Sequence, residues 1–192
     1  LFRSGFRLDG AGKRNYAGAS VSSAGDVNGD GFDDAIMGTS TGGYIVFGKA
    51  AGFDAAMNLS AIDGNNGFRL DGAVTHSPFA MSAIFSAAGD VNGDGFDDVI
   101  IGASDADPNG ENSGSSYVVF GKASGFDAAM NLSNLDGNNG FRLDGAAREA
   151  FSGKSASTAG DVNGDGFDDL IVGAPGRFYD NPASYVVFGK AS

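Results

Sequence analysis

The eleven residues from Ala24 to Asp34 read Ala-Gly-Asp-Val-Asn-Gly-Asp-Gly-Phe-Asp-Asp, and the same eleven return without a change at Ala88–Asp98 and Ala159–Asp169. The copies start 64 and then 71 residues apart. A motif that recurs at a nearly fixed period is the signature of a repeat architecture, in which each repeat is one small structural unit. The chain of 192 residues is therefore predicted to consist of three copies of one unit.

Three further segments recur around this motif and keep their order in the units. Gly-Phe-Arg-Leu-Asp-Gly begins at Gly5, Gly67 and Gly140; Tyr-hydrophobic-Val-Phe-Gly begins at Tyr44, Tyr117 and Tyr185; Gly-Phe-Asp-Ala-Ala-Met-Asn-Leu-Ser begins at Gly52 and Gly125. No linker rich in Pro or Ser separates the copies. We therefore predict one continuous array, 1–192, with units at about 1–50, 51–123 and 124–192.

The local pattern of each unit predicts short β-strands. In Gly-Phe-Arg-Leu-Asp-Gly the apolar and charged residues alternate, which places Phe6 and Leu8 on one face of a strand and Arg7 and Asp9 on the other. Continuous apolar runs are typical of strands buried on both faces. Such runs occupy 35–37, 99–101, 170–172, 44–47, 117–120 and 185–188, and weaker strands are expected near 17–23, 81–87 and 153–158.

Four short strands per unit, separated by turns rich in Gly and Asp, describe a blade of a β-propeller. The predicted fold is therefore all-β, with three four-stranded antiparallel blades. The inserts Asp54–Asn58 and Asp127–Asn131 are predicted to be loops, although each has room for one helical turn.

The composition limits the classes of function. Asp outnumbers Glu by 22 to 2, and 33 of the 192 residues are Gly, which favours turns over helices. The formal net charge is −12 and no basic cluster is present, so we expect no binding of nucleic acid. The sequence has no run of 18 apolar residues, so membrane insertion is not expected. The absence of Cys excludes disulfides and thiolate metal sites.

The repeated motif carries oxygen-bearing side chains at loop positions 1, 3, 5 and 9, counted from its first aspartate. Side chains two residues apart in a curling loop turn toward one point, and the Gly at position 6 permits the sharp turn. Without a cation, three carboxylates at such a separation repel one another. The predicted ligands are the side chains of Asp26, Asn28, Asp30, Asp34, Asp90, Asn92, Asp94, Asp98, Asp161, Asn163, Asp165 and Asp169, completed by the position-7 backbone carbonyls of Phe32, Phe96 and Phe167.

The ligand type indicates the ion. A shell made only of oxygens, on a loop that contains Gly, suits Ca²⁺ better than Mg²⁺, which demands a tight octahedron and keeps its waters. An EF-hand would need a bidentate Glu at position 12, where this chain has Met37, Ile101 and Val172. A strand rather than a helix is also predicted after the loop. We therefore predict three Ca²⁺ ions per chain, bound outside any EF-hand.

These features together resemble the FG-GAP repeat of integrin α-subunit propellers and of many bacterial surface proteins. The resemblance rests on the Asp-x-Asn-x-Asp-Gly-x-x-Asp loop, the apolar strand after it, and Gly-Ala-Pro at Gly173–Pro175. In the first two copies, the last motif is replaced by Gly38-Thr39-Ser40 and Gly102-Ala103-Ser104. The resemblance implies one four-stranded blade per repeat, a Ca²⁺-binding loop in a hairpin between two strands, and an extracellular or cell-surface location.

Several other polar residues are predicted to have no role in binding or catalysis. The position-8 aspartates are expected to point outward into solvent, and the single histidine, His76, has no second His, Cys or nucleophile to act with. The repeated Arg beside Asp is expected to be an edge-strand charge that discourages aggregation. The position-8 residues are Asp33, Asp97 and Asp168, and the arginines are Arg7, Arg69 and Arg142.

Two functions fit these observations. The first is an extracellular structural or adhesion module, stabilised by Ca²⁺, that binds a protein or glycan or assembles with itself. The alternative is a repeat region of a secreted carbohydrate-active enzyme, in which it carries substrate or lines the cleft. Catalysis needs unique residues, and every acidic cluster here is repeated, so the chain is predicted not to be an enzyme. Three blades leave two open faces, which predicts self-association or packing against the remainder of a longer propeller.

Overall fold

The computed structural model describes residues 5–50, 52–72, 83–123, 125–177 and 182–191. Nearly all of its regular structure is β-strand, with two short 3₁₀ turns, η1 (Leu59–Ala61) and η2 (Leu132–Asn134). A five-stranded sheet has the order β10 (Ala129–Asn131), β6 (Gly67–Asp71), β4 (Gly42–Val46), β3 (Asp34–Thr39), β2 (Ser20–Gly25). A four-stranded sheet has the order β11 (Gly140–Asp144), β9 (Ser115–Val119), β8 (Asp98–Ala103), β7 (Ile84–Gly89). A three-stranded sheet contains β12 (Ser155–Gly160), β13 (Asp169–Ala174) and β14 (Ala183–Val187), and a two-stranded sheet pairs β1 (Arg7–Asp9) with β5 (Ala56–Asn58).

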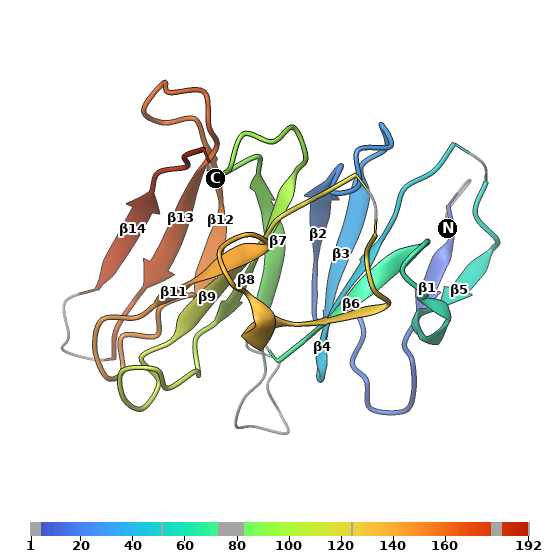
Figure 1. Ribbon diagram of the computed structural model, residues 1–192. Helices are drawn as coiled ribbons and strands as arrows, with labels where there is room; N and C mark the ends of the chain where they lie inside the picture. Colours follow the sequence, from blue (N-terminus) through green and yellow to red (C-terminus); the bar gives the residue numbers. More distant parts are fainter. Residues whose placement is uncertain (1–4, 51, 73–82, 124, 178–181, 192) are drawn as a thin grey trace.

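The sheets stand side by side in one row and do not close on themselves (Figure 1). The all-β prediction is confirmed, and every predicted strand region contains a strand. Three four-stranded antiparallel blades are not confirmed, because the described sheets have five, four, three and two strands.

The unequal sheets follow from the pairing of the Gly-Phe-Arg-Leu-Asp strand, with β10 adding a fifth strand to one sheet. This strand pairs antiparallel with the Tyr-containing strand of the unit before it: β6 with β4, and β11 with β9. Its first copy, β1, therefore stands apart from the three larger sheets, and β14 has no such partner within the described residues.

The inserts were wrongly predicted to be loops. Ala56–Asn58 forms strand β5, which lies parallel to β1, and Ala129–Asn131 forms β10, which lies parallel to β6. The helical turn follows these strands, because the Asn58 side chain accepts a hydrogen bond from the Ser60 N–H at 2.9 Å and caps η1. Buried Leu59 then packs against the adjacent sheet, with Met37 and Tyr44.

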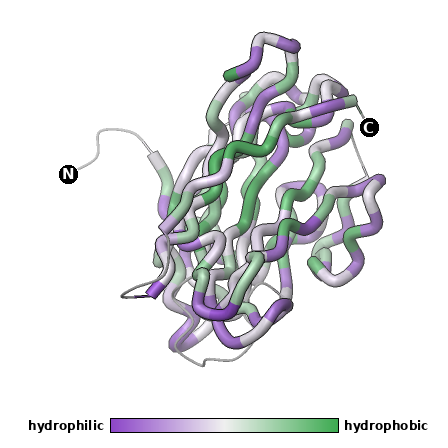
Figure 2. The backbone as a smooth tube through the Cα atoms, turned by 90° about the vertical axis from the view of Figure 1, so that its left-hand side faces the viewer, coloured by the Kyte–Doolittle hydropathy of each residue, from purple (hydrophilic) through white to green (hydrophobic). Residues whose placement is uncertain are grey.

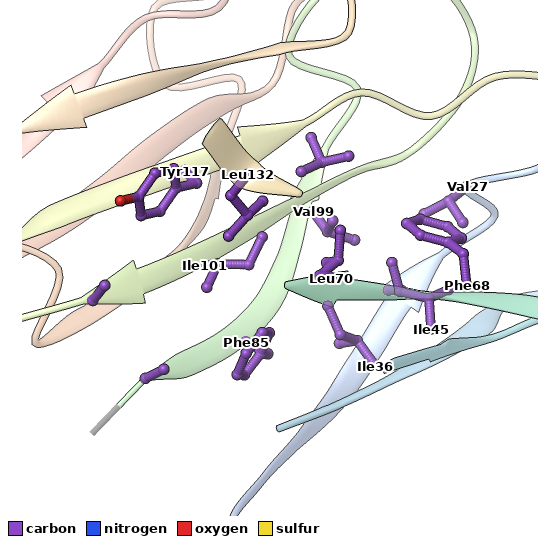
Figure 3. Packing of buried hydrophobic residues seen from close by; sticks show 14 of the residues in the cluster. Val27, Ile36, Ile45, Phe68, Leu70, Phe85, Val99, Ile101, Tyr117 and Leu132 are labelled. Carbon is purple, nitrogen blue, oxygen red and sulfur yellow. The ribbon is translucent and has the colours of Figure 1, made fainter. Parts of the chain in front are cut away.

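The core lies between neighbouring sheets. Ile36 and Ile45 of the five-stranded sheet pack with Phe85, Val99 and Ile101 of the four-stranded sheet, all of them buried (Figure 3). A second cluster joins the four-stranded sheet to the three-stranded sheet. The continuous apolar runs are therefore buried on both faces in a sheet that has neighbours on both sides. This packing of sheet on sheet also fixes the positions of the acidic loops.

Candidate metal centre

The three acidic loops connect the first two strands of each larger sheet, β2 to β3, β7 to β8 and β12 to β13. They adopt one backbone conformation. The position-6 glycines Gly31, Gly95 and Gly166 have φ of 88°, 89° and 91°, as the predicted sharp turn requires. The identical sequences therefore give three copies of one loop, and a site in one of them is expected in all.

The side-chain oxygens of positions 1 and 3 converge inside each loop. In the middle loop, the Asp94 N–H donates to Asp90 Oδ1 at 3.1 Å and to Asn92 Oδ1 at 2.9 Å, which brings a carboxylate and an amide oxygen to one point. The Asn92 side-chain amide donates to Asp94 Oδ2 at 2.9 Å. The outer loops repeat these contacts, with Asp26, Asn28, Asp30 and with Asp161, Asn163, Asp165. Hydrogen bonds therefore join the residues of positions 1, 3 and 5 in every loop.

Position 9 is buried rather than exposed on the loop. Asp98 is fully buried, and its two oxygens accept hydrogen bonds from the Val91 N–H at 3.0 Å and the Gly121 N–H at 2.9 Å. Burial raises the pKa of Asp98 to about 7 and that of Asp34 to about 6, because a carboxylate removed from water is harder to ionise. Asp169 makes the same pair of hydrogen bonds. This residue thus ties the loop to the chain just after β4, β9 or β14.

The donor set fits a hard cation in its chemistry, although the described residues contain no group of three or more His, Cys, Asp or Glu side chains arranged as a metal site. The carboxylates at position 1 turn toward N–H groups of the loop itself. The Oδ2 of each of these carboxylates accepts one N–H, and a carboxylate oxygen has two lone pairs, so Oδ2 keeps one for a cation. The assignment of the ligands, including the carbonyls of Phe32, Phe96 and Phe167, stays a prediction.

The loops form no ion pair with a basic side chain in the described part of the chain. Positions 1, 5, 8 and 9 place four carboxylates in each loop. In the part of the chain that the structure describes, the ion pairs join Arg7, Arg69, Arg142, Arg148 and Arg177 to acids outside the loops. Among the described residues, no ion pair therefore offsets the negative charge of the loops.

The prediction for position 8 is wrong in two of the three loops. Asp97 Oδ2 accepts a hydrogen bond from the Asp26 N–H at 2.7 Å, and Asp168 Oδ2 accepts one from the Asp90 N–H at 3.0 Å. Each carboxylate thus reaches the loop of the preceding sheet. Asp33, which has no preceding loop in the described structure, is exposed. The triple recurrence of Asp at this position was the available signal, because a solvated turn position accepts many polar residues.

The Asp97 bridge gives a stability prediction. Asp97→Ala should lower the free energy of unfolding by about 1.5–3 kcal/mol, because it removes a hydrogen bond to a charged group and so leaves the Asp26 N–H without a partner. Asp33→Ala, its exposed counterpart, should change stability by at most about 0.5 kcal/mol in dilute solution. Urea unfolding of both variants, each at low chain concentration, measures the difference. Equal effects would mean that the bridge does not stabilise the array.

Glycines at position 4 give a second matched pair. Gly93 and Gly164 have φ of 73° and 77°, so alanine should cost about 1 kcal/mol at either position. A Cβ at Gly93 would overlap the ring of Phe167 from the next sheet, whereas the space at Gly164 is open. Gly93→Ala should therefore cost a further ~1–3 kcal/mol. Thermal melts of the two variants that shifted by the same amount would contradict this packing.

The remaining polar residues singled out from the sequence take no part in the loops. Arg7, Arg69 and Arg142 each pair with an Asp of the same strand, as in the 2.7 Å contact of Arg69 with Asp71. Such exposed pairs add little stability. His76 lies outside the described residues.

The comparisons with known proteins agree with this architecture. Residues 84–119 and 153–188 match the FG-GAP repeat family. The chain carries FG-GAP repeats. The two matched segments run from β7 through β9 and from the start of β12 through β14, so each includes an acidic loop. The first unit contains the same eleven-residue motif outside the matched segments.

The curated relatives are integrin alpha chains. The chain is 29% identical over 172 residues to integrin alpha-PS5 of Drosophila melanogaster, an alignment that covers 84% of this chain and 15% of the relative. It is 30% identical over 173 residues to integrin alpha-PS2 of Drosophila melanogaster, covering 88% and 11%. It is 35% identical over 97 residues to integrin alpha-2 of Mus musculus, covering 50% and 8%. The chain thus spans less than a sixth of the length of these relatives. No helix among the described residues is long and apolar enough to cross a membrane.

Proposed function

We propose that this chain is a calcium-binding, extracellular structural or adhesion module built of FG-GAP propeller blades, with three Ca²⁺ ions per chain. The observation that supports it most is the threefold recurrence of one loop geometry with four carboxylates and no basic partner among the described residues. A divalent cation supplies the missing counter-charge. Three such ions would change the formal net charge from −12 to about −6.

In this proposal each residue of the loop has a distinct task. The side chains of positions 1, 3 and 5 hold the ion; in the middle loop these are Asp90, Asn92 and Asp94. Asp98 anchors the loop through two backbone N–H groups, and presents its remaining lone pairs to the ion. The bound ion would neutralise the carboxylates, which otherwise repel one another and favour opening of the loop.

The relatives support the location and the adhesive role. They are named as integrin alpha chains, and the similarity extends along most of this chain. A cell-surface or extracellular place for this chain follows by analogy with those proteins. The carboxylates that could bind a cation recur in three identical loops, and repeated residues serve the scaffold first, so we propose a role in binding rather than catalysis.

The test compares binding with hydrolysis. Fluorescently labelled chain is applied to an array of extracellular-matrix proteins and polysaccharides, in Ca²⁺ and in EDTA, and new reducing ends are assayed on each polysaccharide. The proposal expects retention on a protein or glycan surface that is lost in EDTA, and no new reducing ends. Release of reducing sugar would favour the carbohydrate-active enzyme, and retention unaffected by EDTA would contradict the calcium-dependent role.

A further inference from the structure

The two junctions between the larger sheets repeat the same contacts. At the first junction, Asp97 bridges to the Asp26 N–H, its own N–H donates to the Asp26 carbonyl at 3.2 Å, and the Lys122 N–H donates to the Val27 carbonyl at 2.9 Å. In each sheet, we call the face that carries the position-8 aspartate the front; Asp97 lies on the front of the four-stranded sheet. We call the opposite face, which carries the backbone groups of positions 1 and 2, the rear; Asp26 and Val27 lie on the rear of the five-stranded sheet. The second junction has the same contacts, made by Asp168 and Lys190 to Asp90 and Val91.

The rear of the three-stranded sheet is uncovered among the described residues. The groups that correspond to the junction partners are the Asp161 N–H and the Val162 carbonyl, and neither has a hydrogen-bond partner there. Val162, Ile171 and Val186 are 60%, 40% and 47% exposed, whereas their counterparts in the other two sheets are at most 3% exposed. Figure 2 views this end of the row and shows hydrophobic stretches along the strands.

The front of the five-stranded sheet presents the complementary groups. Asp33 occupies the place of Asp97 and is exposed. Phe32 is 41% exposed, whereas its counterparts lie over position-4 glycines of the preceding loop. Val21 is 68% exposed, although its counterpart Phe85 is buried between two sheets. The front at one end of the row thus matches the rear at the other end.

The strand edges complement each other as well. β14 lacks the outer strand that β6 and β11 supply to the other sheets, and β1 has that strand's sequence with only β5 beside it in the described structure. Joining β1 to β14 would give the order β5-β1-β14-β13-β12. That is the order already seen in the five-stranded sheet, β10-β6-β4-β3-β2.

We propose that the rear of the three-stranded sheet binds the front of the five-stranded sheet of a second copy of this chain, with β1 of that copy added to β14. The occupant is identified by the two internal junctions, which show the same surfaces covered by a front of this sequence. β1 and β14 lie at opposite ends of the row, so one chain cannot make the contact with itself (Figure 1). Two copies that join at both ends make six sheets, within the range of closed propellers.

Sedimentation velocity in Ca²⁺ from 1 to 100 µM chain tests the contact, with circular dichroism to check the fold. The unchanged chain should form dimers or longer assemblies. Val162→Asp changes the rear and Asp33→Ala changes the front. Each variant should need at least a tenfold higher chain concentration to associate. Ser133→Ala, an exposed change on η2 in the middle of the chain, should have no effect. A mixture of Val162→Asp and Asp33→Ala should recover a dimer, because it restores one intact front and one intact rear.

Cross-linking tests the register, since the chain has no Cys of its own. In the β11–β9 pair, Leu143 lies opposite Ser116, so Leu8 should lie opposite Ser184 of the second copy. Leu8→Cys with Ser184→Cys should give covalent dimers on mild oxidation, more than tenfold above Leu8→Cys with Tyr185→Cys, which is out of register.

Two results would overturn the proposal. One is a folded chain that stays monomeric to 100 µM in Ca²⁺. The other is association that Val162→Asp and Asp33→Ala leave unchanged. Calcium binding measured on the same samples separates this failure from a failure of the proposed calcium sites.

Discussion

Removal of calcium should lower the melting temperature of this chain by about 8–16 °C. Extracellular calcium modules bind with Kd around 10⁻⁴ to 10⁻³ M, and at ten times Kd each site contributes RT ln 11, about 1.4 kcal/mol. Three sites contribute about 4 kcal/mol, and each kcal/mol corresponds to about 2–4 °C for a chain of this length. The melting curve in excess Ca²⁺ and in EDTA measures the shift.

The control for this prediction removes the ligands rather than the ion. A triple variant with Asp30→Asn, Asp94→Asn and Asp165→Asn loses one charge from each loop while keeping its shape. It should melt in Ca²⁺ near the temperature of the unchanged chain in EDTA, and EDTA should barely move it. Mg²⁺ should restore the unchanged chain less than Ca²⁺ does, because it holds its waters more tightly. A melting curve that EDTA leaves in place would contradict the stabilising role.

The second large effect is expected at the buried aspartate of position 9. Asp98→Ala should lower the free energy of unfolding by about 3–6 kcal/mol, because it leaves the buried N–H groups of Val91 and Gly121 without partners and opens a small cavity. The loss should appear in EDTA as well as in Ca²⁺, since these hydrogen bonds do not involve the ion. Chemical denaturation under both conditions measures it.

Asp94→Ala is the matched comparison, because it alters an exposed residue of the same loop. It should cost about 1–2 kcal/mol in Ca²⁺, through the lost ligand, and less than about 0.5 kcal/mol in EDTA. If Asp98→Ala were as mild as Asp94→Ala in EDTA, the anchoring role of position 9 would be wrong.

Most of the local structure could be predicted from the sequence because its causes are local, whereas the insert strands β5 and β10, which depend on parallel pairing with distant strands, were missed. Alternating and continuous apolar runs specify strands, and the Gly at position 6 specifies the turn in each loop. The partner of a strand is a different matter. Alternation shows that Gly67–Asp71 is a strand, yet it does not show that the strand joins the sheet of the preceding unit, since that choice depends on contacts between distant residues.

The same difference between local and long-range contacts applies to the candidate metal site. The spacing of Asp90, Asn92 and Asp94 predicted side chains that meet in one loop, and hydrogen bonds do join these three residues. Their assignment as ligands stays a prediction. The roles of Asp97 and Asp98 depend on neighbouring sheets. Asp97 reaches another loop, and buried Asp98 accepts from Gly121 just after β9, so neither role is visible in the spacing within one loop.

A count of bound calcium tests the account most directly. The chain, dialysed against 10 mM CaCl₂, about ten times the weaker Kd expected, is separated from free ion by ultrafiltration, and calcium per chain is measured by atomic absorption. The account predicts about three ions for the unchanged chain and a large loss for the triple variant of Asp30, Asp94 and Asp165. No calcium above the buffer, or equal calcium on the triple variant, would contradict it.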